Sequence, residues 1–374
     1  MIKNSINNLR KEIDKIDLKI LKLLEKRLSI VRKINILKEK LKLPLTSKKR
    51  EDEIIKNLSL KAKDILIRDF ISDIYENIFD ISKKERILKN KKINSGNVGI
   101  IGLGLIGGSI AKTLKYINKE IKIFGIFKDK DSQKAYKEKI IDQIFNFENL
   151  IKNSNLIIIS APIEIILKIA KRIKNLNENL RNEILVIDTG SIKENIVKEF
   201  EILSDEKTEF LGTHPMAGWH KSGFENSKIG LFINYPWIIT PHKKNKKSSI
   251  NLISNFVQNL GSKPFILSSK DHDKITSRIS HFNYLLTLYL FAYVYEKNKS
   301  YLKYAGTGFR TVTRLVSSNP YMWNQIFLNN YENIKKEKEE FIKFLKNFKI
   351  DKDNFLKVSI KYKKLRDKFF ENEK

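Results

Sequence analysis

The first part of the chain has the periodicity of helices. Between residues 9 and 40, apolar residues recur at steps of three and four, and neither Gly nor Pro interrupts them. The pattern predicts one helix of about 45 Å at 1.5 Å per residue, which needs partners along its whole length. Pro44 predicts the end of this helix, and two shorter helices are predicted at residues 51–58 and 63–86.

The middle of the chain follows a different pattern. Short apolar runs alternate with helical stretches, which predicts a mainly parallel sheet with helices on its faces. The predicted strands are residues 98–101, 121–126, 156–160, 184–187, 210–212 and 237–240. From residue 271 onward the periodicity is helical again, with aromatic-rich helices predicted at residues 277–295, 321–347 and 353–370.

These changes of pattern divide the chain. At roughly 100–200 residues per domain, 374 residues suggest two or three domains. We predict an all-α domain over residues 1–88, a polar linker over 89–96, an α/β domain over 97–268 and a second all-α domain over 269–374.

Composition narrows the class of protein. The chain has no cysteine, so it offers no disulfide, zinc finger or thiol nucleophile, and we expect no metal. The start lacks the apolar segment of a signal peptide and no apolar run approaches the roughly 18 residues of a membrane span, so we expect a cytoplasmic protein without a membrane partner.

The net charge of +30 invites a nucleic-acid-binding interpretation. Lysine, isoleucine and asparagine, however, are abundant in turns, helices and strands alike, and the basic runs are short and separated. We therefore expect a solvated basic surface that attracts small anionic substrates, with no nucleic acid bound. The alternative from another functional class is a basic nucleic-acid-binding protein that uses the same predicted α/β domain.

A glycine-rich stretch, GLGLIG at residues 102–107, directly follows a predicted strand and begins a helix. Gly102 makes the tight turn, Gly104 lets the backbone approach a pyrophosphate, and Gly107 lets helix and strand pack closely. The arrangement predicts a Rossmann-type dinucleotide-binding domain, and a purely structural turn is the alternative. The loop residues expected at the cofactor include Leu103, Leu105 and Ile106.

The end of the second strand does not decide between NAD and NADP. An acid that binds the ribose hydroxyls is usual where this chain has Phe127, with Lys128 beside it and Asp129 two residues late. Asp129 could reach the ribose, whereas Lys128 could accept a 2′-phosphate. We expect NAD, leave NADP open, and add Ser160, at the end of a later strand, to the cofactor residues.

The stretch GTHPMAGWHKSG at residues 212–223 contains two of the five histidines. We expect His214 just past the end of a strand, where open α/β sheets bind ligands. Ser191 follows the preceding strand in DTGSIKE. A hydride leaves an alcohol carbon only as the hydroxyl loses its proton, so a neutral imidazole suits the base and Ser191 the orienting hydroxyl. A loop histidine that caps a turn is the alternative.

Two arginines follow in the last part of the chain. Arg310 and Arg314 lie in GTGFRTVTR, which we interpret as a glycine-rich loop, and an arginine there suits bidentate carboxylate binding. Surface arginines near a turn are the alternative.

Five motifs together resemble the prephenate dehydrogenase, or TyrA-type, family: GLGLIGGS, DTGSIKE, GTHPMAG, HDKITSRISH and GFRTVTRLVSSNPYMW. The resemblance implies oxidative decarboxylation of prephenate to 4-hydroxyphenylpyruvate, the tyrosine precursor, with His214 as base, Ser191 orienting the hydroxyl and Arg314 binding a carboxylate. It also implies a homodimer through the C-terminal helical domain. Further expected substrate residues are His281, Trp323, Ser318 and Arg310.

Two positions depart from this family's pattern. His220 stands where the family has Glu, and Tyr284 where a second His is frequent. Both are expected near prephenate, so the choice between prephenate and arogenate stays open.

The first predicted helix carries cations on its apolar face. Arg27 and Lys38 are eleven residues apart, close to three turns, and need an anion to meet them. Residues 5–88 resemble the all-helical chorismate mutase family, which implies an intertwined dimer with Arg10 reaching the partner's site. The chorismate residues that the resemblance implies are Arg10, Arg27, Lys38, Arg50, Glu51, Ser82 and Arg86.

The mutase resemblance also has departures, because Arg86 stands where Gln or Glu is usual and Ser47 where an acid is frequent. We nevertheless expect a bifunctional enzyme that rearranges chorismate to prephenate and then oxidises prephenate. The alternative is a dehydrogenase that also uses arogenate and whose N-terminal helices serve only dimerisation.

Overall fold

The structure is a computed structural model that describes residues 2–44, 47–89, 91–93, 96–126, 129–176, 183–218 and 221–371. Contacts divide it into two units, Met1–Lys91 and Lys92–Lys374.

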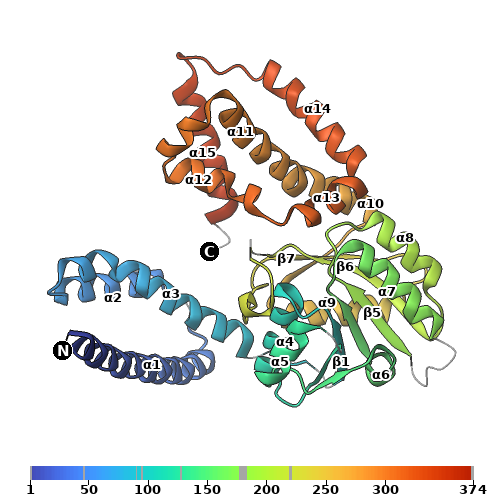
Figure 1. The fold of residues 1–374 in the computed structure, drawn as a ribbon, viewed down its shortest axis with the longest axis horizontal. Helices are drawn as coiled ribbons and strands as arrows, with labels where there is room; N and C mark the ends of the chain where they lie inside the picture. Colours follow the sequence, from blue (N-terminus) through green and yellow to red (C-terminus); the bar gives the residue numbers. More distant parts are fainter. Residues whose placement is uncertain are drawn as a thin grey trace. The chain divides into compact units, whose positions relative to one another are not determined.

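The first unit is all helical (Figure 1), as the periodicity predicts. It consists of α1 (Ile2–Lys40), α2 (Lys48–Lys61) and α3 (Ile65–Lys89). Ser47 caps α2, because its hydroxyl accepts from the backbone N–H of Arg50 at 3.3 Å. Much of the apolar face of α1 is exposed, with Leu9 at 60% and Leu23 at 64%. A helix with such a face requires a further partner.

The second unit is built on an eight-stranded sheet with the order β3-β2-β1-β4-β5-β6-β7-β8. All neighbouring strands are parallel except β6 and β7. The strands are β1 (Asn97–Ile101), β2 (Lys122–Ile126), β3 (Gln143–Phe145), β4 (Leu156–Ile159), β5 (Ile184–Asp188), β6 (Thr208–Pro215), β7 (Pro236–Thr240) and β8 (Lys263–Ile266). The chain order reverses between β1 and β4, so a crevice is expected at their carboxyl ends.

Helices cover both faces of this sheet (Figure 1), and a core lies on each side. Ile100 belongs to one core and Ile101 to the other, because successive side chains of a strand point to opposite faces. The covering helices are α4 (Leu105–Ile117), α5 (Lys130–Lys137), α6 (Phe147–Asn153), α7 (Ile163–Asn175), α8 (Glu194–Leu203) and α9 (Lys247–Asn259).

The last part of the unit is helical and more broken than the periodicity predicts. The predicted helix at 321–347 is in fact two, separated at Asn330, whose side-chain amide donates to the carbonyl oxygen of Asp273 at 2.8 Å. The predicted helix at 277–295 begins with a π-helical turn at Ser277–His281. The helices here are α10 (Ser269–Thr276), α11 (Phe282–Asn298), α12 (Thr307–Val312), α13 (Pro320–Asn329), α14 (Tyr331–Asn347) and α15 (Phe355–Glu371). Throughout the described residues, every helix is too short or too polar to cross a membrane.

Candidate active sites

The glycine-rich loop joins β1 to α4, next to the end of β4. Gly102 has φ +94°, and a Cβ there would lie 2.1 Å from the carbonyl oxygen of Ser160. A Cβ on Gly107 would lie 2.1 Å from the carbonyl oxygen of Gly102. Gly104, the N-cap of α4, has open space instead, with its nearest neighbour 3.7 Å from a built Cβ. The loop therefore presents the first amides of α4 to a phosphate without side chains in the way, which fits a dinucleotide.

Two of the predicted cofactor residues, Leu103 and Asp129, already have contacts within the protein that limit what they can offer a cofactor. The Leu103 side chain is fully buried in the core, so it has only backbone to offer a cofactor. Asp129 caps α5, and its carboxylate accepts from the backbone N–H groups of Leu103 at 3.4 Å and Asp131 at 3.0 Å. It lies beside the loop and retains lone pairs for a ribose hydroxyl. Phe127 and Lys128 lie outside the described residues.

A cavity of about 330 Å³ brings together most of the predicted dehydrogenase residues. It lies between the carboxyl-end residues of β5 and β6 and the helices that follow α10. The predicted residues that line it are Ser191, His214, His281, Arg314, Ser318 and Trp323.

His214 is not past its strand, as the sequence predicted, but inside it. β6 continues to Pro215 because it pairs with antiparallel β7, which places His214 opposite Ile238. The imidazole is therefore held by a sheet rather than by a loop, which makes its position more rigid. Among the described residues, no hydrogen bond joins the Ser191 hydroxyl to His214. Both side chains line the same cavity, so a molecule bound there could contact both.

Behind His214 lies a buried chain of hydrogen bonds. Nδ1 of His214 is 2.8 Å from Nε2 of His272, and Nδ1 of His272 is 2.7 Å from Oδ1 of Asp273. The Asp273 carboxylate also accepts from the backbone N–H groups of Lys193 and Glu194, both at 2.8 Å. His272 and Asp273 lie in the motif HDKITSRISH, but nothing in their spacing from His214 predicts contact, so the sequence assigns them no role.

Burial keeps these histidines neutral. It lowers the pKa of His214 well below its ordinary value, and the neighbouring His272, Lys193 and His281 lower it further. Burial also lowers the pKa of His272, against the opposing effect of Asp273, and that of His281 to about 4. An imidazole that is neutral at pH 7 is competent to accept a proton.

A fully buried ion pair anchors the strand and the turn that carry His214 and Ser191. The ammonium of Lys193 contacts Asp188 and donates to the carbonyl oxygen of Thr213 at 2.8 Å. Asp188 in turn accepts from the backbone N–H groups of Thr213 at 3.0 Å and Gly190 at 2.8 Å. Both residues were missed by sequence analysis, although they lie in the quoted motif DTGSIKE.

The remaining predicted dehydrogenase residues are dispersed. Arg310 and Arg314 lie on short helical turns rather than in a loop. Arg310 is exposed, donates to the carbonyl oxygen of Ala305 at 3.0 Å and does not line the cavity. Tyr284 stacks on Trp323 at 4.1 Å and lines an adjacent cavity of about 300 Å³. The indole N–H of Trp323 is buried without a partner among the described residues. His220 lies outside the described residues.

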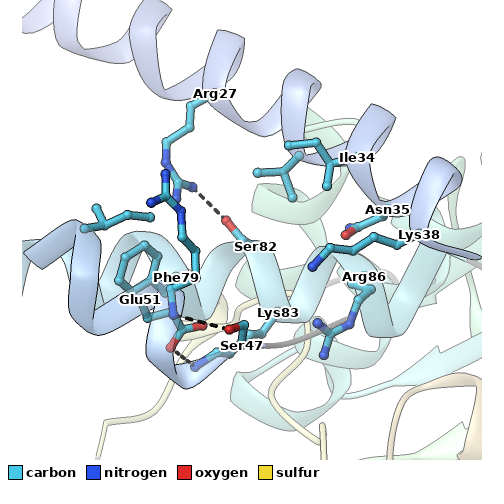
Figure 2. A pocket seen from close by; sticks show the side chains of 13 residues that line it. Arg27, Ile34, Asn35, Lys38, Ser47, Glu51, Phe79, Ser82, Lys83 and Arg86 are labelled. Carbon is cyan, nitrogen blue, oxygen red and sulfur yellow. Dashed lines mark hydrogen bonds and ion pairs between the residues drawn. The ribbon is translucent and has the colours of Figure 1, made fainter. Parts of the chain in front are cut away.

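The N-terminal unit holds its own pocket of about 190 Å³, formed by α1, the start of α2 and α3 (Figure 2). Arg27 donates to the Ser82 hydroxyl at 2.9 Å and lies over the Phe79 ring. Of the seven predicted chorismate residues, six line the pocket: Arg27, Lys38, Arg50, Glu51, Ser82 and Arg86. Arg10 is exposed on α1 and does not line it.

The pocket is strongly cationic. Glu51 is its single acidic lining residue in the described part of the chain, and Lys83, which sequence analysis missed, donates to it at 2.9 Å. The side chains of Lys38 and Arg86 face each other across the pocket (Figure 2) without a hydrogen-bond or ion-pair partner among the described residues. Unpaired cations on a partly buried surface favour an anionic ligand.

Family models match most of the chain. A model described as chorismate mutase type II matches residues 9–86. Models described as the nucleotide-binding domain and the dimerization domain of prephenate dehydrogenase match residues 110–266 and 268–353.

Individual relatives agree with the family models. The prephenate dehydrogenase of Bacillus subtilis is 33% identical over 65% of this chain and 67% of its own, and that of Lactococcus lactis is 34% identical over 66% and 68%. A crystal structure of prephenate dehydrogenase from A. aeolicus, in complex with hydroxyphenyl propionate and NAD+, has a TM-score of 0.64 at 30% identity. It covers 75% of this chain and 99% of its own.

Proposed function

Because the chain belongs to the prephenate dehydrogenase family and carries a type II chorismate mutase domain, we propose how its own residues perform the two reactions. The enzyme rearranges chorismate to prephenate and oxidatively decarboxylates prephenate to 4-hydroxyphenylpyruvate, as part of tyrosine biosynthesis. What supports the assignment of residues is that two separate cavities each gather the groups that one reaction needs.

In the mutase pocket, binding and electrostatics are sufficient, because the rearrangement needs neither a nucleophile nor a base. Arg27 and Arg50 bind the carboxylates of chorismate. The hydrogen bond from Arg27 to the Ser82 hydroxyl fixes the position of the Arg27 side chain. Lys38 and Arg86 face the ether oxygen, which gains negative charge as its bond to the ring breaks. Glu51, held by Lys83, accepts from the substrate hydroxyl.

In the dehydrogenase cavity, His214 is the base. Its Nδ1 is engaged by His272, so Nε2 is the nitrogen that accepts the proton of the prephenate ring hydroxyl. Ser191 orients that hydroxyl, and Arg314 binds a substrate carboxylate. As the O–H bond breaks, the ring carbon loses a hydride and the ring carboxylate leaves as CO2.

The glycine-rich loop and Asp129 hold the dinucleotide. When bound, the nicotinamide supplies the hydride acceptor. We propose NAD, since the A. aeolicus relative was solved with NAD+ and the Asp129 carboxylate beside the loop would repel a 2′-phosphate. Ser160, whose carbonyl oxygen abuts Gly102, lies at the edge of the same site.

The working form is a homodimer. The matched dimerization domain includes α11, where Tyr289, Leu290 and Tyr293 are exposed, and a second copy would cover them. The exposed apolar face of α1 would pair with its counterpart, which would carry Arg10 to the partner's mutase pocket. We propose the cytoplasm as the place of both reactions, since a chain without cysteine has no need of an oxidising compartment.

A steady-state assay tests these proposals. Chorismate consumption without cofactor measures the mutase, and cofactor reduction is measured with NAD or NADP crossed with prephenate or arogenate. We expect chorismate consumption and the highest kcat/KM with NAD and prephenate. Folded protein that leaves chorismate unchanged would refute the mutase assignment, and preference for NADP or arogenate would refute the corresponding choice.

A further inference from the structure

Asn35 of α1 is a buried polar residue that none of the preceding assignments uses. It lines the mutase pocket and is 5% exposed. Its amide nitrogen has no hydrogen-bond partner among the described residues. Buried side-chain amides in native proteins are nearly always paired, so an unpaired one at the wall of a binding pocket calls for a ligand.

The position of Asn35 indicates which part of the ligand it meets. It lies one helical turn from Val31 and one from Lys38, so all three share the face of α1 that lines the pocket. Figure 2 shows Asn35 beside Lys38, with Arg86 of α3 across from them and Arg27 and Ser82 farther along the pocket. Asn35 therefore belongs to the end of the pocket where Lys38 and Arg86 lie.

We propose that Asn35 is a substrate-binding residue of the mutase site, whose amide N–H donates to the oxygen that Lys38 and Arg86 also face. The inference rests on the proposed mutase function and deepens it. No described hydrogen bond fixes the amide, so rotation about χ2 can present its nitrogen to an oxygen in the pocket at no cost in other bonds.

The neutral donor complements the two cations. Lys38 and Arg86 supply charge, but a lysine ammonium is a point charge on a flexible stem. An asparagine on a short stem, anchored in a helix, donates along a more restricted direction. Three donors at one oxygen stabilise the negative charge that develops there more than they stabilise the substrate, which raises kcat rather than only lowering KM.

If Asn35 served only the structure, replacing it would lower the free energy of unfolding and leave mutase activity unchanged. Its amide nitrogen is unpaired among the described residues, however, so an apolar side chain of similar shape removes an unsatisfied group, and the fold should be unchanged or more stable. Asn35→Leu thus separates the two roles, because the proposal expects loss of mutase activity in a protein that is at least as stable as wild type.

The test uses the full chain with Asn35→Leu and, as matched control, Asn57→Leu on the exposed surface of α2. Chorismate consumption without cofactor gives mutase kcat and KM, prephenate oxidation gives the dehydrogenase rate, and thermal unfolding reports stability. We expect mutase kcat to fall by about tenfold or more in Asn35→Leu only, with the dehydrogenase rate unchanged and an unfolding midpoint no lower than that of wild type. Mutase kcat within twofold of wild type would overturn the proposal.

A second variant covers the case in which Asn35→Leu does not fold. Asn35→Asp keeps the shape but replaces the donor by a carboxylate, so we expect low mutase activity at neutral pH that partly recovers as the carboxylate is protonated at acid pH. A wild-type rate at neutral pH would overturn the proposal. If wild-type protein itself does not consume chorismate, the mutase function fails and takes this inference with it. Active wild type with an equally active Asn35 variant refutes the inference alone.

Discussion

Nδ1 of His214 lies 2.8 Å from Nε2 of His272, and this contact fixes which nitrogen of His214 can act as a base. The Asp273 carboxylate can only accept, so Nδ1 of His272 carries its proton and Nε2 of His272 accepts. The proton of the contact therefore comes from Nδ1 of His214. This hydrogen-bond assignment leaves the lone pair of His214 on Nε2, as proton abstraction requires.

Asp273→Asn tests this chain of hydrogen bonds. The carboxylate now accepts hydrogen bonds from three N–H donors, and the side-chain N–H groups of Asn would face at least one of them. The hydrogen bonds that set the tautomers of both histidines would therefore be weakened. We expect dehydrogenase turnover to fall by about tenfold or more, by less than removal of the base, with the mutase rate unchanged. Wild-type dehydrogenase turnover, measured as cofactor reduction, would contradict the role of the chain.

The Lys193–Asp188 pair should matter for stability as well as for activity. Lys193→Met leaves the fully buried Asp188 without its cation, so we expect a loss of about 3–5 kcal/mol in the free energy of unfolding. The matched control is Lys363→Met, which breaks the exposed pair with Asp367 and should cost at most about 1 kcal/mol. Denaturant unfolding measures both, and equal losses would refute the distinction.

Stability should fall as the pH drops below about 6.5. His214, His272 and His281 have pKa values below their ordinary value in the folded chain, so between that value and the folded pKa only the unfolded chain takes up protons. Each contributes stability that is fully present above about pH 6.5 and declines by up to about 1.4 kcal/mol per pH unit below it.

Thermal unfolding at fixed protein concentration between pH 8 and 5 measures this dependence. His281→Asn, which removes one titrating group, should make the slope shallower. An unfolding midpoint that is constant from pH 7 to 5 would contradict the burial of neutral histidines.

The sequence predicted the order of folds because hydrophobic periodicity is local. The helices of the first unit and six of the eight strands lie where the pattern places them. β3 and β8 were missed because one has three residues and the other carries Lys263 and Pro264. The predicted helix at 321–347 was wrong at Asn330, whose bonds to a distant element end one helix and begin the next.

The residues of the candidate sites also fall into two groups, those with a local sequence signal and those that only the fold brings together. Residues in motifs with a local signal, such as the glycines of the loop and His214, could be named from sequence. His272, Asp273 and Lys193 reach the candidate site through contacts that depend on the fold, and His272 lies 58 residues from His214 in the sequence. Asn35 and Lys83 carry no motif, and only the folded pocket reveals them.

Arg86 should contribute to the mutase reaction as a permanent cation. Arg86→Met removes a charge that faces Lys38 across the pocket, so we expect mutase kcat to fall by about 10- to 100-fold without a change in the dehydrogenase rate. Lys84→Met, also on α3 but outside the pocket, serves as control, since Lys84 pairs with Asp80 and with no other group in the described part of the chain. Chorismate consumption measures both, and equal rates for the two variants would refute the assignment.

We propose that one chain performs two reactions at two separate sites, with His214 as the base of the second. The most direct test is His214→Asn in the full chain, with chorismate consumption and prephenate-dependent cofactor reduction measured on the same preparation. We expect dehydrogenase turnover at least about 10²-fold lower, with mutase turnover unchanged. Near-normal cofactor reduction, or an equal loss of both activities in folded protein, would contradict it.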